Sequence, residues 1–283
     1  MKVFRIISKL DIKDLYLVNS RLLEGLRVLG NPQDFIKFYY DQGIDEFILH
    51  DVTASYIGRN TLYDKLKTIT KGTFLPLTLG GGIRKIDDVE KILNCGADKI
   101  FFNTSIVDNP KFVEEAVRIY GSSTIAANIV ISKNDNNYIL LKNHGRDFKD
   151  KNPLDWIKFL ESIGVGEIIL TFAHKEGTKS GFDFEFLNSI KSNISVPFII
   201  NGGADSADSI IEISKYSFVS GVAISTIFHE MYKINSFEKK VSKNLESRFD
   251  NLNKTQYKSG RKFTNIIKHI KKKLLQNKVF VRR

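Results

Sequence analysis

Two glycine-rich stretches stand where they could bind an anion. Gly80–Gly82 follows the apolar run Leu77–Leu79, Gly202-Gly203 follows Phe198–Ile200, and a segment with helical periodicity comes after each. Free backbone N–H groups and the positive end of a helix dipole both favour phosphate at such a junction. The two copies lie about 120 residues apart, which indicates a duplicated half-unit. The sequence therefore predicts two phosphate sites related by the duplication.

The elements that position these loops alternate between apolar, β-branched runs and segments of helical period, as in a parallel sheet with crossover helices. We predict strands at Phe4–Leu10, Glu46–Asp51, Phe74–Leu79, Lys99–Phe102, Thr124–Ile131, Glu167–Phe172, Phe198–Ile200 and Gly221–Ile224. We predict helices at Pro32–Gln42, Leu62–Thr70, Ile86–Leu93, Pro110–Tyr120, Leu154–Ser162, Phe184–Ser192, Ser206–Lys215 and Phe263–Leu275. About eight strand-helix repeats close a (β/α)8 TIM barrel. The fold class is therefore α/β, a TIM barrel with half-barrel internal duplication, with an open doubly wound sheet as the alternative.

Residues at the two ends of the predicted strands differ in kind. In a TIM barrel the residues at the strand C-terminal ends form the active mouth. Small and polar residues are expected there, namely Asp11, Asp51, Gly82, Asn103, Thr104, Thr171, Glu176, Gly177, Gly203 and Ser225. The strand starts carry the charged residues Arg5, Glu46, Lys99 and Glu167. We therefore expect a polar mouth at one end and charged residues around the other.

The charge is unevenly distributed along the 283 residues. The formal net charge is +11, but from residue 231 onward 16 Lys+Arg oppose 3 Asp+Glu, so the rest of the chain is almost neutral. Sparse aromatics in this tail make a nucleic-acid partner unlikely. The single cysteine, Cys95, allows no internal disulfide, and no apolar run is long enough to span a bilayer. We expect a cytoplasmic protein with no membrane contact, no cofactor and no metal, since the histidines lack metal-ligand spacing.

Several segments carry a family likeness. The chain resembles the cyclase subunit of imidazole glycerol phosphate synthase, the HisF-like barrels, from Arg5 to about Phe228 and again in the last helix. The matching stretches are Leu10-Asp11-Ile12-Lys13-Asp14, Gly43-Ile44-Asp45-Glu46, Asp51-Val52-Thr53-Ala54-Ser55, Gly80-Gly81-Gly82-Ile83, Gly96-Ala97-Asp98-Lys99, Asn103-Thr104, Gly177-Thr178-Lys179-Ser180-Gly181 and Gly202-Gly203-Ala204. So many stretches in the same order make the resemblance specific.

The resemblance implies partners and roles. In that family a glutaminase docks on the strand N-terminal face, and its ammonia travels through the barrel to the mouth. There it serves to split a bis-phosphorylated ribulosyl nucleotide into imidazole glycerol phosphate and an aminoimidazole carboxamide ribotide. The implied phosphate sites are Gly82, Asn103 and Thr104 for one, and Gly177, Gly203 and Ser225 for the other. The resemblance implies that the gate to the ammonia path consists of Arg5, Glu46, Lys99 and Glu167. The alternative is that these residues form ordinary surface ion pairs without a role in function.

The mouth departs from the family pattern. The family uses two aspartates for proton transfer at the ends of the first and fifth strands; Asp11 matches the first, and Val130 stands at the second. Valine cannot exchange a proton, a role typically worth about 10²- to 10⁴-fold in rate. Asn19 stands at the position of a substrate-contacting lysine, His144 replaces a small hydroxyl residue, and Glu176 replaces a shorter acid. The sequence therefore predicts that cyclase activity is lost.

Three hypotheses for the function follow. The leading one is a HisF-like barrel that docks a glutaminase and conducts its ammonia to a separate acceptor amidotransferase, which makes acetamidino sugars for surface polysaccharides. The first alternative is a genuine cyclase of histidine biosynthesis that uses an unusual base. The second is a scaffold that conducts nothing. A phosphorylated small molecule at the mouth is expected under either of the first two.

The predicted domain division has three parts. Residues 1–230 form the barrel body, residues 231–262 a basic insertion after the eighth strand that the family lacks, and residues 263–283 the final barrel helix and tail. The insertion should project near the mouth, either as a solvated surface loop or as a docking surface for the acceptor enzyme. The final helix should bury one apolar face, formed by Ile266, Ile267, Ile270 and Leu274.

Overall fold

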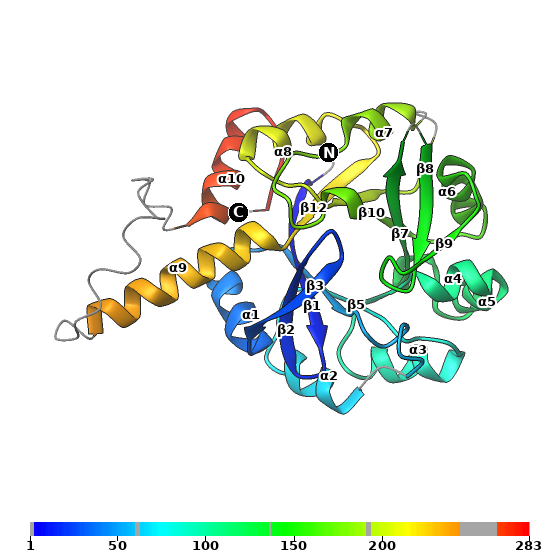
Figure 1. Cartoon of the computed structure of the whole chain (residues 1–283), viewed down its shortest axis with the longest axis horizontal. Coiled ribbons are helices and arrows are strands. Elements are labelled where there is room, and N and C mark those ends of the chain that lie inside the picture. Colours follow the sequence, from blue (N-terminus) through cyan, green and yellow to red (C-terminus); the bar gives the residue numbers. More distant parts are fainter. Residues whose placement is uncertain (1–2, 60–62, 136, 191–193, 244–264, 283) are drawn as a thin grey trace.

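Eight parallel strands close into a barrel, with helices between successive strands (Figure 1). The structure is a computed structural model and describes residues 3–59, 63–135, 137–190, 194–243 and 265–282. The barrel strands are β1 (Arg5–Lys13), β4 (Glu46–Asp51), β5 (Leu77–Gly80), β6 (Lys99–Phe102), β7 (Ile125–Asn134), β10 (Glu167–Phe172), β11 (Phe198–Asn201) and β12 (Val219–Ile224). The pairing of β7 with β10 and of β12 with β1 completes the closure. The predicted TIM barrel is confirmed, and the open sheet is excluded.

Most helices lie where periodicity predicts them. They are α1 (Pro32–Asp41), α2 (Tyr63–Thr70), α3 (Ile86–Leu93), α4 (Thr104–Asp108), α5 (Pro110–Tyr120), α6 (Pro153–Ser162), α7 (Phe184–Ser189), α8 (Ala207–Ser214), α9 (Thr226–Lys243) and α10 (Ile266–Gln276). Short 3-10 turns occur at η1 (Ser122–Thr124) and η2 (Ala173–Lys175). Three helices begin at an Asn-Pro step, in which the Asn side chain accepts a backbone N–H and Pro occupies the first turn: Asn31-Pro32, Asn109-Pro110 and Asn152-Pro153.

Several predicted boundaries are wrong, and one cannot be compared. The strand predicted from Phe74 begins instead at Leu77, because Phe74 is 84% exposed and Pro76 has no N–H to pair. The helix predicted to end at Ser192 ends at Ser189, because the backbone of Ile190 is extended, and the helix predicted from Phe263 begins at Ile266, where the Asn265 side chain caps it. The predicted start at Leu62 lies outside the described residues.

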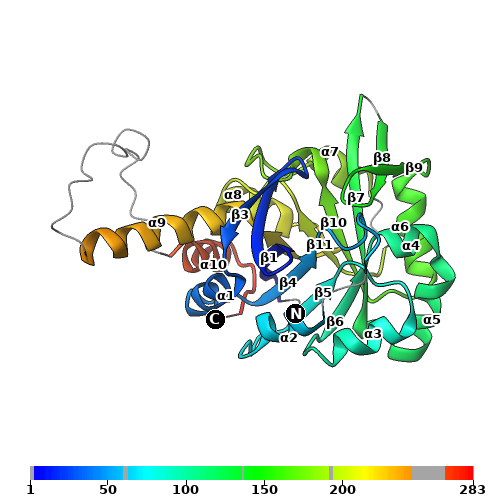
Figure 2. The same cartoon turned by 60° about the horizontal axis from the view of Figure 1, so that its bottom comes forward.

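Two antiparallel hairpins extend the sheet and were not predicted. The first joins β2 (Tyr16–Arg21) to β3 (Glu24–Gly30) and continues from the end of β1. The second is formed by an extension of β7 with β8 (Asn137–Lys142) and β9 (Asp147–Lys149). Figure 2 shows both hairpins beyond the same end of the barrel. Both follow a barrel strand C-terminally, so both stand at the mouth.

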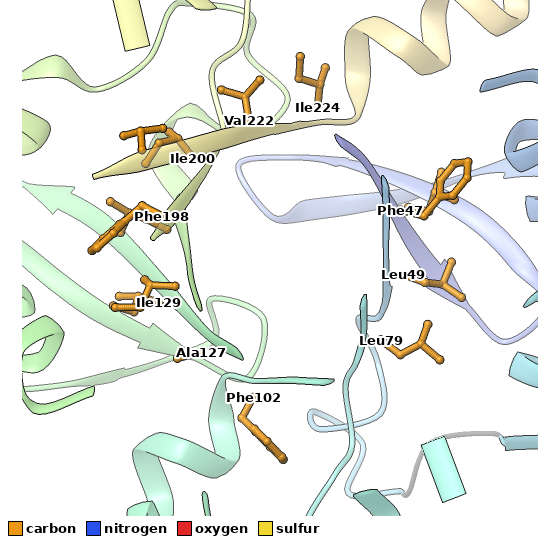
Figure 3. Close-up of a cluster of buried hydrophobic side chains, with 14 of the residues drawn as sticks. Phe47, Leu49, Leu79, Phe102, Ala127, Ile129, Phe198, Ile200, Val222 and Ile224 are labelled. Carbon is orange, nitrogen blue, oxygen red and sulfur yellow. The ribbon is translucent and has the colours of Figure 1, made fainter. Parts of the chain in front are cut away.

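The core lies between the strands and the surrounding helices. Outward-facing strand side chains such as Phe47, Leu79, Phe102 and Phe198 are almost fully buried there (Figure 3). Burying a side chain of this size contributes roughly 1.5–3 kcal/mol. A separate, smaller apolar cluster fills the barrel interior. Successive residues of a strand alternate between these two environments, so each strand presents a second set of side chains to the barrel axis.

The C-terminal part contains one predicted helix and one that was not predicted. In α10, Ile267, Ile270 and Leu274 are buried as expected. The first part of the predicted insertion is not a loop, because α9 runs unbroken to Lys243; it packs on α1 and then extends away from the body (Figures 1 and 2). Residues 244–262 of the insertion lie outside the described residues, so the domain division stays a prediction. No helix in the described part of the chain is long and apolar enough to cross a membrane.

Candidate active site and charge networks on the barrel axis

Strand β1 points four side chains toward the barrel axis, from its N-terminal end to the mouth. Arg5, Ile7, Lys9 and Asp11 alternate with outward-facing core residues along the strand. Arg5 lies at the strand N-terminal end and Asp11 at the mouth. The axis therefore passes from a charged level through an apolar level to a second charged level.

The first level is the N-terminal ring, which we define as Arg5, Glu46, Lys99 and Glu167. Arg5 Nη1 lies 3.1 Å from both Glu46 carboxylate oxygens, and Arg5 Nη2 donates to Glu167. Lys99 Nζ lies 3.0 Å from Glu167 Oε2. Burial would lower the pKa of Arg5, but Glu167 and Glu46 outweigh it and raise that pKa. All four predicted gate residues thus form one connected ion network across the barrel.

The second level is apolar. It contains the interior cluster Ile7, Ile48, Phe101, Ala126, Ile169, Ile199 and Ala223. A small neutral molecule loses far less hydration free energy on entering such a layer than an isolated ion does. The layer therefore discriminates against charge between the two polar ends.

The third level is the mouth network, which we define as Lys9, Asp11 and Glu176. Lys9 Nζ lies 3.0 Å from Asp11 Oδ2 and 3.6 Å from Glu176 Oε1, and the three side chains are no more than 5% exposed. Burial would lower the pKa of Lys9, but the two carboxylates raise it. Burial would raise the pKa of Asp11, but Lys9 and His50 hold it well below its usual range. Asp11 is therefore an ion-pair partner whose carboxylate stays ionised.

A belt of uncharged polar side chains extends this network around the mouth. Asn201 Nδ2 donates to Glu176 Oε2 at 2.9 Å and to Thr171 Oγ1 at 3.3 Å, and Thr171 Oγ1 donates to Asn128 Oδ1 at 3.0 Å. Ser225 Oγ donates to Glu176 Oε1 at 3.3 Å. The predicted mouth residues Thr171, Glu176 and Ser225 are thus brought together.

The two glycine loops occupy matching places. A Cβ on Gly81 would lie 2.3 Å from the Asp51 carbonyl oxygen, at the end of β4, and a Cβ on Gly202 would lie 2.6 Å from the Phe172 carbonyl oxygen, at the end of β10. Both residues have a positive φ, near 100°. Glycine is therefore required at both for the same two reasons, close backbone approach and backbone conformation.

The first predicted phosphate site forms a pocket. It is lined by Gly82, Asn103 and Thr104 together with two histidines, His50 and His144. His50 Nδ1 lies 3.4 Å from Asp11 Oδ1, and burial lowers the pKa of His144 to about 4. His144 Nε2 has no hydrogen-bond partner among the described residues. The pocket thus joins the glycine loop to the mouth network.

The Asp51 carboxylate stabilises the loop that forms one wall of this pocket. Its carboxylate accepts from Arg59 at 2.7 Å and from the backbone N–H of Ala54 at 3.2 Å. Gly82 N–H donates to Ser55 Oγ at 3.3 Å in the same loop. Asp51 therefore shapes the loop beside the glycines.

Val130 lies in an apolar environment at the opposite side of the mouth. It packs with Leu23, Leu141 and Ala173 in a small buried cluster. An ionised carboxylate in such surroundings would lose most of its hydration without a compensating partner. The valine at this position therefore matches its apolar neighbours.

Sequence reasoning missed Lys9 and His50 as mouth residues. Both lie in strands that are mostly buried, and Lys9 lies on the same face of β1 as Ile7 and Asp11. A lysine at an inward position of a fully buried strand is rarely accommodated without a partner. The two-residue spacing from Asp11 was the signal that could have identified it.

Comparisons with known proteins agree with the fold. Residues 5–232 match the family model described as "Histidine biosynthesis protein". The chain is 41% identical over 204 residues to imidazole glycerol phosphate synthase subunit HisF of Legionella pneumophila, covering 72% of this chain and 96% of that protein. It is 42% identical over 200 residues to the HisF subunit of Campylobacter concisus, with 71% and 79% covered. It is 35% identical over 226 residues to that of Streptococcus sanguinis, with 80% and 90% covered.

These relatives carry the name of the cyclase-family enzyme, so they favour the cyclase alternative over the leading hypothesis from the sequence. The surface-polysaccharide role finds no support among them. The match extends over more than half of the chain and includes all eight barrel strands. The chain therefore belongs to the histidine biosynthesis protein family.

Proposed function

We propose that this chain is the barrel subunit of a glutaminase-coupled synthase. A HisH-like glutaminase would dock on the strand N-terminal face, and its ammonia would pass along the barrel axis to the mouth. The observation that carries the proposal is the order of levels on the axis. A connected ion network closes one end, an apolar layer follows, and polar groups surround the other end.

For the chemistry at the mouth, the cyclase is the first candidate, because the relatives are named as imidazole glycerol phosphate synthase subunits. Asp11 would be the retained proton-transfer group. The glycine loops at Gly82 and Gly203 would hold the two phosphates of the substrate through backbone N–H groups. Under this candidate, another group must take over the role of the acid missing at Val130.

The second candidate is ammonia delivery to a separate acceptor enzyme without cyclisation, as in the acetamidino-sugar pathways of surface polysaccharides. Two observations favour it. Val130 lies in an apolar cluster, and Asp11 is bound to the buried ammonium of Lys9. A carboxylate with a strongly lowered pKa is a weak base and cannot act as an acid near neutral pH. Both proton-transfer positions are thereby altered together.

Turnover of the bis-phosphorylated cyclase substrate distinguishes the two candidates. The purified chain would be assayed with ammonium salts in place of the glutaminase, beside Asp11→Asn as the matched control. Turnover near that of ordinary enzymes, lost in Asp11→Asn, would establish the cyclase. If neither protein turns the substrate over while the wild type still stimulates a glutaminase partner, ammonia delivery is supported. If the wild-type chain neither turns over the substrate nor stimulates a glutaminase, the proposal is wrong and the scaffold hypothesis remains.

A further inference from the structure

The tip of the β2–β3 hairpin has an unusual backbone. Arg21 pairs with Glu24, so the turn consists of Leu22 and Leu23 alone. Both leucines are left-handed, with φ of 55° and 64°. Such turns usually take glycine or asparagine, because a bulky side chain is disfavoured at positive φ. Tertiary contacts must therefore compensate for this backbone.

Those contacts come from Leu23, which inserts into the mouth. Leu22 is 47% exposed, whereas Leu23 is 7% exposed. Leu23 packs with Val130, Leu141 and Ala173, the apolar cluster that replaces the second acid. A Cβ on Gly145 would lie 2.9 Å from Leu23 Cδ1, so the turn after β8 also fits closely around this side chain.

The same hairpin is seated on the second predicted phosphate loop. Leu22 N–H donates to the Glu176 carbonyl oxygen at 2.8 Å. A Cβ on Gly177 would lie 2.4 Å from the Ser20 carbonyl oxygen, so the two backbones are in direct contact. Thr226 Oγ1 lies 3.5 Å from Asn19 Oδ1, which adds a link to the segment after Ser225. The Ser20 carbonyl oxygen, which repels anions, thus faces this loop at Gly177.

The first phosphate loop has different neighbours. The pocket at Gly82, Asn103 and Thr104 is lined by residues of β4 and β6, of the loops after β4 and β5, of the start of α4 and of the turn after β8. None of its lining residues comes from the β2–β3 hairpin. It also contains the imidazoles of His50 and His144, which can donate an N–H to an anion. The mouth therefore has an open side at Gly82 and a plugged side at Gly177.

We propose that the mouth binds a single phosphate-type anion, on the open side, because Leu23 anchors the hairpin as a plug over the other phosphate loop. A ligand with two phosphates that spans the mouth must first displace Leu23 from Val130. Leu23 is then the residue that decides between singly and doubly phosphorylated ligands. This inference rests on the contacts of the barrel alone. It agrees with ammonia delivery as it stands, whereas the cyclase candidate requires Leu23 to leave Val130 before the bis-phosphorylated substrate can occupy both loops.

Backbone amide NMR of the uniformly labelled protein, titrated with inorganic phosphate, tests the proposal. In the wild type, the amide signals of Gly82, Asn103 and Thr104 should shift with saturation, and those of Gly177 and Gly203 should not. In Leu23→Ser, which removes the apolar anchor, Gly177 and Gly203 should shift too. Leu22→Ser is the matched control, since it changes the exposed leucine of the same turn and should behave as the wild type.

Each result decides the proposal. Saturable shifts at both loops of the wild type, or at neither, would overturn it. Equal behaviour of Leu23→Ser and Leu22→Ser would show that Leu23 is no plug; Leu23→Ala provides the same comparison if the serine variant does not fold. The titration needs neither a glutaminase nor the cyclase substrate, so its failure leaves the turnover assay unaffected.

Discussion

The two ends of the barrel axis both carry a basic side chain between two carboxylates, but they differ in access to water. At the N-terminal ring, the side chains of Lys99, Arg5 and Glu46 are 27%, 17% and 14% exposed, and only Glu167, at 4%, is as buried as the mouth residues. At the mouth network, Lys9 is 4% exposed and both of its carboxylate partners are equally buried. The same kinds of charge are therefore placed in two different dielectric environments.

Because of this difference in solvent exposure, the N-terminal ring and the mouth network suit different roles. Ion pairs that reach solvent can exchange a partner for water at little cost, so a docking protein can rearrange them. Buried ion pairs attract more strongly, and each ion would lose several kcal/mol if left alone. We infer that the N-terminal ring is suited to opening, and that the mouth network holds Asp11 in place.

The largest expected effect is on Lys9. Lys9→Met leaves Asp11 and Glu176 buried without their cation, which should lower the free energy of unfolding by about 3–5 kcal/mol. Urea unfolding measures this loss. Adding Asp11→Asn and Glu176→Gln to the same protein should recover much of the stability, because no charge is then left unpaired. A loss for Lys9→Met no larger than that for Lys99→Met would contradict the proposed difference between the two ends.

The next effect is a pH dependence that belongs to the mouth. The pKa of His144 is about 4 in the folded protein and about 6.5 in an unfolded chain, so the unfolded chain takes up the proton first as the pH falls. Stability should therefore decrease between pH 7 and pH 4. The free energy of unfolding of His144→Gln should therefore change less over this pH range than that of the wild type. Part of the pH dependence should remain in that variant, because the pKa of His229 is also lowered, to about 3.

The control for this pH prediction comes from the other end of the barrel. The N-terminal ring contains no histidine, so Lys99→Met should keep the pH dependence of the wild type. An unchanged slope in His144→Gln would mean that His144 is not held neutral by burial.

The smallest effect on stability is expected for Lys99. Lys99→Met removes one partly exposed ion pair with Glu167, which should cost about 0.2–1 kcal/mol. Under the proposed function its effect on coupling to the glutaminase should be larger, because the proposed gate loses one of its four charges. With a glutaminase partner present, the amount of glutamine hydrolysed per ammonia used at the mouth should change. An unaltered ratio in both Lys99→Met and Arg5→Met would support the scaffold hypothesis.

Much of the barrel could be predicted from local patterns. The strands at Glu46–Asp51, Lys99–Phe102 and Glu167–Phe172 match their predicted bounds, since apolar periodicity reports burial directly. The hairpins were missed because their strands are largely exposed and carry no such periodicity; β3 has no fully buried residue. The β2–β3 turn is also built from two leucines, which no turn rule would select.

The candidate site was predicted in part for a related reason. Family-matching residues such as Gly82, Asn103 and Ser225 could be assigned by position, and the structure brings them to one mouth. The spacing of Lys9 from Asp11 indicates that both share one face of the strand, but it does not reveal which side chain lies across the barrel. Only closure of the sheet brings Glu176, from the loop after β10, to within 3.6 Å of Lys9 on β1.

The sequence by itself determined the order of strands and helices, the glycines that the two loops require and the loss of an acid at Val130. These depend on neighbours along the chain, on backbone conformation and on the chemistry of one side chain. The tertiary structure decided that Asp11 is bound to Lys9, that Leu23 covers Val130 and that one side of the mouth is plugged. Each of these is a contact between distant segments, and its energy exists only after the barrel has closed and excluded water.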